Sequence, residues 1–355
     1  MKQLLLIGCS LFSLSAFSQK VFFTSPQTFK ESELKTFYAS IRQHDNVILF
    51  NAPDYRLYAY DKITGAKKWS QDIKRKSNRA PFFVGGHIWT KVGDHVVQLD
   101  TATGEKVKDL VFETVDTEPF EKNGLLYFTG IYEGGSIIAY DLQKDTILWK
   151  RFIAHGSSQQ PYYQKDKIVV NAEGSNWLEM NYAGQMKEAT CNTTGDEIPS
   201  GPNCVKEFSA LTHDGKPITG KLAKDLFQED YTIPEVLTTS KNTFVLGNSN
   251  EQLTVFGDKL KKKVQVELFD VSDVLSEFNT DSLTHPDESL AKILKADDTY
   301  VWIAYYHHLL IYNYSKKAID RVIDLSAWEP HQIITDNNNL WIISKKDGRL
   351  YGVSI

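Results

Sequence analysis

Short runs of apolar residues alternate with turn-forming residues along most of this chain. The clearest unit begins with the run Asn46–Phe50, continues with the alternating run Arg56–Asp61 and ends at Trp69. Apolar side chains at every second position predict β-strands with one buried face. Asp61 and Gly65 are spaced as in a tight hairpin, because Asp bonds backbone amides a few residues ahead and Gly accepts a left-handed conformation. The unit therefore predicts strand, strand, tight turn and strand.

This unit recurs at a nearly constant spacing. The turn position is taken by Asp61, Asp100, Asp141 and Asn181, which are 39, 41 and 40 residues apart, and Gly104 repeats the glycine of the first turn. Self-similarity at this period, with several short strands in each repeat, is typical of β-propeller blades rather than of a sandwich. We therefore predict an all-β chain of four-stranded blades.

Three later copies are more divergent, and they decide the number of blades. Their strand pairs are Asn242–Leu246 with Leu253–Phe256, Tyr300–Ile303 with Leu309–Tyr312, and Leu340–Ile343 with Arg349–Val353. The last copy lacks an outer strand, which Val21–Thr24 can supply, so that an N-terminal strand closes a ring of seven blades. Eight blades are the alternative, because 76 residues separate Asn181 from Gly257 and contain a strand–turn–strand pattern at Phe208–Ile218.

An irregular stretch at about 190–230 interrupts the repeats and holds two of the three cysteines. We predict an insertion in which Cys191 and Cys204 form a disulfide, since an even pair of cysteines in an exported protein most simply pairs. Metal ligation is the alternative, although no His or acidic residue stands at metal-site spacing around the two cysteines.

The N-terminus has the pattern of a secretory signal peptide. A basic residue, a thirteen-residue apolar run and a small-residue cleavage pattern precede Gln19. We therefore predict removal of residues 1–18, which leaves a single propeller domain over residues 19–355. A lipoprotein is the alternative, since Leu6–Cys9 resembles a lipobox; only a protein lipidated at Cys9 would be held at a membrane.

Composition and charge narrow the classes of partner. Of the 355 residues 41% are hydrophobic and 12% aromatic, and the formal net charge is −5. Abundant aromatic side chains favour strands. The lysines and arginines form no basic stripe, so we expect no nucleic-acid binding. We expect the protein to be monomeric.

The motif from Leu57 to Trp69 resembles the PQQ-like repeat, whose consensus ends in Thr-Gly followed by Trp. The segment from Asp141 to Trp149 is similar, with Asp145 in place of the glycine, and the segment from Asp100 to Gly104 matches without the tryptophan. In that family the tryptophan packs between neighbouring blades. The resemblance therefore implies that Trp69 and Trp149 dock one blade on the next.

Proteins with this repeat fall into two functional classes. One class is the quinoprotein dehydrogenases, which hold pyrroloquinoline quinone over calcium, and the other is the non-catalytic scaffolds of the cell envelope. The dehydrogenases are longer, many carry a disulfide between adjacent cysteines, and no Glu, Asn and Asp set for calcium stands out in this sequence. We therefore expect no cofactor and no metal.

No motif for catalysis is recognisable in the sequence. It lacks the nucleophile elbow, the zinc-protease motif and the phosphate-binding glycine loops. His307 and His308 are adjacent, and on a regular strand they would point to opposite faces and could not share one metal ion.

Together these patterns predict an exported, non-catalytic propeller of the periplasm or envelope of a Gram-negative bacterium, or one released outside the cell. We expect it to bind a protein partner through loops on one face. The alternative is a propeller that binds a small molecule or glycan in its central channel, including an enzyme that acts there.

Overall fold

A computed structural model shows an all-β chain. It describes residues 19–74, 80–131, 134–153, 161–163, 165–172, 176–186, 210–211, 217–218, 235–247, 252–257, 261–267 and 291–355. Within these ranges one helix is present, α1 (Glu31–Thr36). No helix of the described part has the length and apolar character needed to cross a membrane.

Six antiparallel sheets of four strands are found among the described residues. Five follow the order of the chain, and their strands are β2 (Ser40–His44), β3 (Val47–Ala52), β4 (Arg56–Asp61) and β5 (Lys67–Asp72); β6 (Phe82–Val84), β7 (His87–Val92), β8 (His95–Asp100) and β9 (Lys106–Asp109); β10 (Phe120–Lys122), β11 (Leu125–Ile131), β12 (Gly135–Asp141) and β13 (Thr146–Phe152); β19 (Glu235–Thr238), β20 (Asn242–Gly247), β21 (Gln252–Gly257) and β22 (Lys262–Glu267); and β23 (Ala291–Ala296), β24 (Tyr300–Tyr305), β25 (His308–Asn313) and β26 (Ala318–Asp324).

The sixth sheet joins the two ends of the described chain. The strand β1 (Lys20–Thr24) pairs with β29 (Leu350–Ser354), which is followed by β28 (Asn339–Ser344) and β27 (Pro330–Asp336). The N-terminal strand thus takes the outer place in the last sheet.

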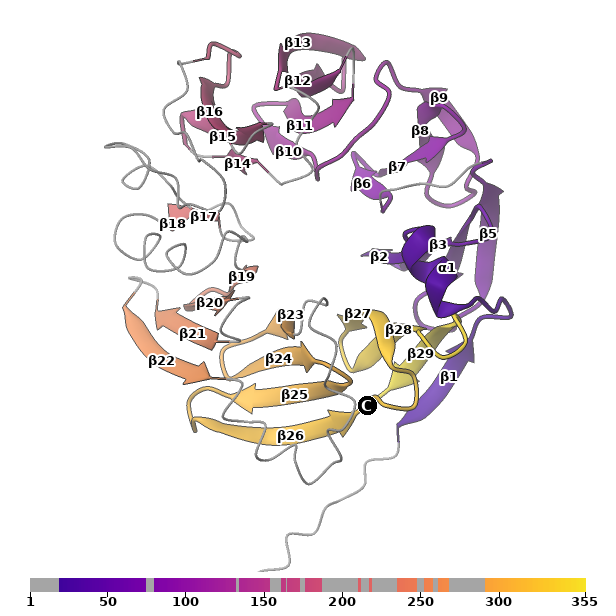
Figure 1. The fold of residues 1–355 in the computed structure, drawn as a ribbon, viewed down its shortest axis with the longest axis vertical. Helices are drawn as coiled ribbons and strands as arrows, with labels where there is room; N and C mark the ends of the chain where they lie inside the picture. Colours follow the sequence, from indigo (N-terminus) through magenta and orange to yellow (C-terminus); the bar gives the residue numbers. More distant parts are fainter. Residues whose placement is uncertain are drawn as a thin grey trace, which may run out of the picture.

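The sheets stand around a ring (Figure 1). In the five sheets that follow the order of the chain the first strand is innermost and the last outermost, whereas in the sixth sheet β27 is innermost and β1 outermost. This arrangement is a β-propeller, the fold class that the sequence predicted. Between the third and fourth four-stranded sheets of the chain lie a three-stranded sheet and a short two-stranded ladder. Their strands are β14 (Tyr162–Tyr163), β15 (Lys167–Ala172), β16 (Asn176–Asn181), β17 (Ala210–Leu211) and β18 (Pro217–Ile218).

The choice between seven and eight blades depends on residues 187–234, most of which lie outside the described ranges. The strand–turn–strand pattern expected at Phe208–Ile218 corresponds to the ladder of β17 and β18. Residues 1–18 and both Cys191 and Cys204 also lie outside the described ranges. The blade count, the signal peptide, the disulfide and the insertion therefore stay predictions.

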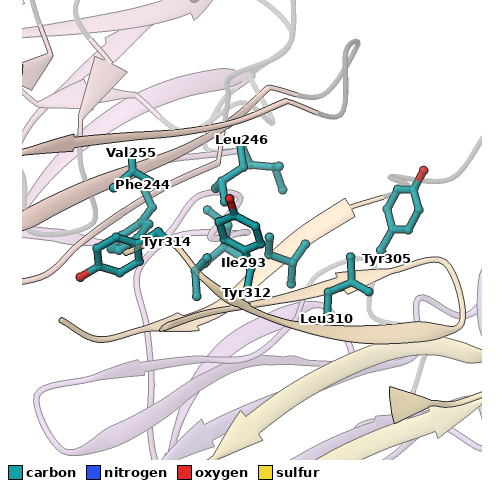
Figure 2. Packing of buried hydrophobic residues seen from close by; sticks show 11 residues of the cluster. Phe244, Leu246, Val255, Ile293, Tyr305, Leu310, Tyr312 and Tyr314 are labelled. Carbon is teal, nitrogen blue, oxygen red and sulfur yellow. The ribbon is translucent and has the colours of Figure 1, made fainter. Parts of the chain in front are cut away.

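The hydrophobic core lies between neighbouring sheets. In one such cluster Phe244, Leu246 and Val255 of β20 and β21 meet Ile293 and Leu310 of the following sheet (Figure 2). Another cluster places Leu49 and Leu57 against Ile88 and Val97 in the same way. Each sheet thus buries both faces, which explains why the middle strands are almost continuously apolar.

The outer strands share one irregularity in register. In β5 the bulge lies between Lys67 and Trp69, which pair with Tyr60 and Ala59 of β4. The same bulge occurs where β9, β13, β22 and β26 pair with their inner neighbours, and where β1 pairs with β29. One extra residue at that point turns the next side chain towards the neighbouring sheet. The positions equivalent to Trp69 are Phe23, Lys108, Trp149, Val264 and Arg321.

At four of these six positions the residue that follows the bulge contacts the tight turn of the next sheet. Trp69 lies on Gly104, where a Cβ would stand 2.5 Å from the indole, and its ring nitrogen donates to Thr101 O at 3.0 Å. Trp149 lies on Gly184 in the same way and donates to Tyr182 O at 3.1 Å. These contacts require a residue without a side chain in the turn.

Two variants of this contact occur in the same molecule. Phe23 of β1 occupies the tryptophan position of the last sheet, and its ring fills the space over Gly65 of the first. At another junction Lys108 takes the place of the tryptophan and Asp145 that of the glycine, and the two form an ion pair at 2.8 Å. Asp145 keeps the left-handed backbone of the glycines, with φ of 56°.

The two adjacent histidines differ from the sequence expectation. His307 lies in the turn before β25, and its ring contacts that of His308 with centroids 4.5 Å apart. The expectation that the rings point to opposite faces is therefore wrong, because a turn residue does not follow the alternation of a strand. His308 is buried, and burial, followed by the charge of His307, lowers its pKa although Asp324 opposes the shift.

The contact of Trp69 with Gly104 predicts a specific loss of stability. Replacing Gly104 with Ala costs the left-handed backbone penalty of about 1–2 kcal/mol and also forces a methyl group into the indole. Gly86 in the same sheet is the matched control, since its φ of 79° is similar but no atom lies within 4 Å of a Cβ there. We expect Gly104→Ala to lose at least about 1 kcal/mol more than Gly86→Ala in urea unfolding. Equal losses would contradict the contact.

Burial of His308 predicts a pH dependence of stability. Because its pKa is lower in the folded state, the unfolded chain binds a proton first as the pH falls below about 6.5. The free energy of unfolding should therefore decrease between pH 7.5 and 5.5, and His308→Asn should reduce that slope. His95→Asn, at an exposed position, is the control. The account fails if wild type and His308→Asn show the same slope in denaturant titrations.

Candidate functional site

A cavity of about 480 Å³ lies where several inner strands begin. It is bounded by α1, by the first residues of β2, β6 and β27, and by the segment that leads into β10. Residues from three sheets and from the segment that leads into a fourth thus meet at one end of the ring. We call this end the α1 face; the turns between β3 and β4 and between β24 and β25 lie on the same side.

The N-terminal segment holds α1 over the ring. After β1, Ser25 N donates to Leu350 O at 2.8 Å and Phe29 N donates to Asp347 O at 2.9 Å. The helix has six residues, and at its start the Glu33 carboxylate accepts from Lys30 N at 2.7 Å. Its single buried side chain, Leu34, enters the core between the last and first sheets. Backbone bonds and one leucine therefore fix the cap of the cavity.

One wall of the cavity carries hydrogen-bond donors. Ser40 and Arg42 lie two residues apart on β2, so both side chains point to the same face. The Arg42 guanidinium lies over the Phe82 ring at 5.4 Å. The side-chain oxygen of Gln332 on β27 accepts from Ile41 N at 2.6 Å, which turns its amide nitrogen away from that bond.

The segment before β10 lines the cavity with carboxylates. Asp116 and Glu118 flank the buried Thr117. The Thr117 hydroxyl accepts from Thr129 N at 2.8 Å, and Asp116 N donates to Thr129 O at 2.7 Å. These bonds fix the backbone that carries the two acidic side chains. The lining of the cavity therefore includes both basic and acidic side chains.

Three tyrosines on the α1 face have a left-handed backbone. The φ angles of Tyr38, Tyr55 and Tyr306 are 52°, 63° and 50°. A bulky residue there costs about 1–2 kcal/mol. Tyr38 and Tyr55 are also exposed, at 50% and 42%. At the other ends of the inner strands, the same conformation is carried by residues that tolerate it better, namely Asp45, Asn123 and Asn337.

The turn residues that the sequence singled out do not line this cavity. Asp61 accepts from the backbone amides of Ile63 and Thr64, and the bond from Thr64 in particular lowers its pKa to about 2. Asp100 and Asp141 make the same pair of bonds, and their pKa values are also lowered, mainly by the amides of Thr103 and Lys144. These carboxylates shape the turns.

The residues of the cavity were not predicted as a site from the sequence. Ser40, Asp116 and His331 come from distant segments, and nothing in the spacing of the chain joins them. In the described ranges no group of three or more His, Cys, Asp or Glu could hold a metal ion.

Comparison with known protein families identifies the family that the first repeats resemble. A protein-family model described as "Outer membrane protein assembly factor BamB" matches residues 32–108. No curated protein sequence matches the chain.

Two solved structures are similar to the chain. The crystal structure of BamB from Moraxella catarrhalis is 13% identical, with 89% of this chain and 82% of that chain covered and a TM-score of 0.42. The computationally designed Ika8 protein is 12% identical, with 89% and 95% covered and a TM-score of 0.57. At this identity the second likeness is one of fold.

The family match covers α1, the whole first sheet and the second sheet as far as Lys108. It therefore includes the Leu57–Trp69 motif on which the resemblance was based. The predicted resemblance to the PQQ-like repeat is thereby confirmed over residues 32–108: the chain is a β-propeller that is similar, over that stretch, to the family described by the BamB model.

Proposed function

We propose that this chain is an exported, non-catalytic propeller that binds a protein partner of the cell envelope through its α1 face. The observation that carries the proposal is the group of tyrosines held in a left-handed backbone there. Backbone strain persists where the surrounding structure enforces it, and it concentrates at functional sites. Tyrosine is also enriched at the centres of protein interfaces.

The described contacts support this use of the face. Phe37 and Tyr55 pack edge to face with ring centroids 5.4 Å apart, so Tyr55 is held while it stays exposed. Farther round the ring Ile131 and Phe152 are exposed, at 39% and 61%, where their strands end. Rigid, exposed aromatic side chains lose little conformational entropy when a partner covers them.

The remaining parts of the proposal come from the sequence and from the family. The description of the family names an assembly factor of the outer membrane, which supports a protein partner and an envelope location. The signal peptide predicted at residues 1–18 supports export into the periplasm of a Gram-negative bacterium, with lipidation at Cys9 as the alternative. We also propose a monomer, a disulfide between Cys191 and Cys204, and inter-blade docking by Trp69 and Trp149.

A second candidate function is the binding of a small molecule or glycan in the central channel. In the catalytic version of this function, the protein is an enzyme that acts on that ligand in the channel. The observation in its favour is the pair of carboxylates, Asp116 and Glu118, on the cavity wall. Turnover of a glycoside or of a quinone-dependent substrate that Asp116→Asn abolishes would support this function over the first.

Site-specific photo-crosslinking tests the proposed function. The photoreactive residue benzoylphenylalanine replaces Tyr38 or Tyr55 in the organism that produces the protein, and it should give a protein adduct at both positions. Ile63 is the control, since it is 68% exposed in a turn between β4 and β5, at the opposite end of the strands. An adduct at 63 of equal yield, or none at 38 and 55, would contradict the proposal.

A stability measurement separates recognition from folding. Tyr55→Asn relieves the left-handed strain, so its free energy of unfolding should be unchanged or higher, while capture of the partner found by crosslinking should fall. A variant that loses stability and binding together would point to a structural role for Tyr55.

A further inference from the structure

The turn between β10 and β11 contains the only Asn-Gly pair of the chain. Lys122 pairs with Leu125, so Asn123 and Gly124 form a two-residue hairpin loop, and their φ angles are 53° and 76°. Positive φ at both residues is what a tight hairpin of the Asn-Gly type requires. Both residues are exposed, and no atom lies within 4 Å of a Cβ placed at Gly124. The surroundings of this turn are therefore open.

The Asn123 carboxamide is not held by hydrogen bonds. Within the described ranges neither its oxygen nor its nitrogen bonds to another residue. Asn337, in the turn between β27 and β28, has the same φ of 53° and serves as a comparison. Its side-chain nitrogen donates to the Asp336 carboxylate at 3.4 Å, and its backbone oxygen accepts from Lys295 Nζ. The two asparagines thus share a backbone angle but differ in how firmly they are held.

The hairpin of β10 and β11 is also short. β10 has three residues, and three residue pairs join it to β11, whereas six pairs join β27 to β28. Local opening of a hairpin costs less free energy when fewer backbone bonds must be broken. The Asn123 turn should therefore open more often than the Asn337 turn, and rotation of the opened main chain brings Gly124 N to the side-chain carbonyl of Asn123.

From these features we infer that Asn123 is a site of spontaneous deamidation. Gly124 N bonds to Asn123 Cγ and loses its proton, the Cγ–Nδ2 bond breaks, and ammonia leaves as a five-membered imide closes. Water then opens the imide at one of its two carbonyls and gives aspartate or isoaspartate, with no change of oxidation state. Because glycine has no side chain, its backbone nitrogen is the least hindered nucleophile that can follow an asparagine.

Isoaspartate at position 123 weakens the junction between the sheet of β10–β13 and the three-stranded sheet that follows. It adds a methylene group to the main chain of a two-residue loop, so the pairing of Lys122 with Leu125 is lost. Lys122 Nζ lies 3.6 Å from the ring centroid of Tyr182, which follows β16, and donates to Lys165 O. Asn123 lies at the end of the strands opposite the α1 face, so this inference goes beyond the proposed function and does not depend on it.

Peptide mapping of the aged protein tests the inference. The purified, folded protein is kept in mildly alkaline buffer at physiological temperature, where more of the backbone nitrogen is deprotonated. The segment with Asn123 should gain about 1 Da and become a substrate of protein isoaspartate methyltransferase, at a rate at least about tenfold above that at Asn337. Equal rates at the two asparagines, or deamidation of Asn123 only after urea has unfolded the chain, overturn the inference.

Two variants separate the chemistry from its consequence. Gly124→Asn recreates the Asn-Asn pair of the Asn337 turn with a residue type that tolerates positive φ, and it should slow deamidation about tenfold. An unchanged rate overturns the inference, and if this variant does not fold, the comparison of Asn123 with Asn337 in the wild type decides. Asn123→Asp adds the charge without the methylene group, so it should unfold at a higher urea concentration than the isoaspartate form. Equal midpoints would contradict the weakened junction.

Discussion

The contact between an outer strand and the tight turn of the next sheet sets how the sheets of this propeller stand against one another. A bulge at the same register in the outer strands turns one side chain out of its own sheet, and the neighbouring turn receives it. Where that side chain is Trp69 or Trp149, the turn must have a glycine. Where it is Lys108, the turn has Asp145, so an ion pair replaces the packing. At the four junctions where the contact occurs, the two positions are thus physically coupled although the residues that fill them differ.

The N-terminal segment serves both this contact and the candidate binding face. Phe23 of β1 packs on Gly65, and a few residues later the same segment places α1 over the cavity. The last and first sheets therefore share one core with Leu34 of the helix. A change that loosens β1 would disturb the binding face as well, so the stability of this junction and the function proposed for it are linked.

The sequence predicted the elements whose signals are local. Asp61 and Gly65 reveal their turn because side chain and amides lie within a few residues of each other, and the middle strands are apolar on both faces. The inner strand Ser40–His44 and the short helix α1 were missed, since four of the five residues of the strand are polar and the helix buries only Leu34. The equivalence of Phe23 and Lys108 with Trp69 depends on strand register, which the spacing of residues along the chain does not reveal. The cavity joins segments that are distant in sequence, so the spacing could not predict it either.

A double-mutant cycle at Lys108 and Asp145 tests the coupling of the two positions most directly. Lys108→Trp and Asp145→Gly together recreate the pair found at Trp69 and Gly104, whereas each alone leaves a mismatched partner. Asp145→Gly also removes the hydrogen bond from the Tyr140 hydroxyl, an effect that cancels because it occurs in both arms of the cycle. We predict that the double variant is more stable than the sum of the single changes by at least about 1 kcal/mol in urea unfolding. Additive changes, with no coupling free energy, would contradict the account.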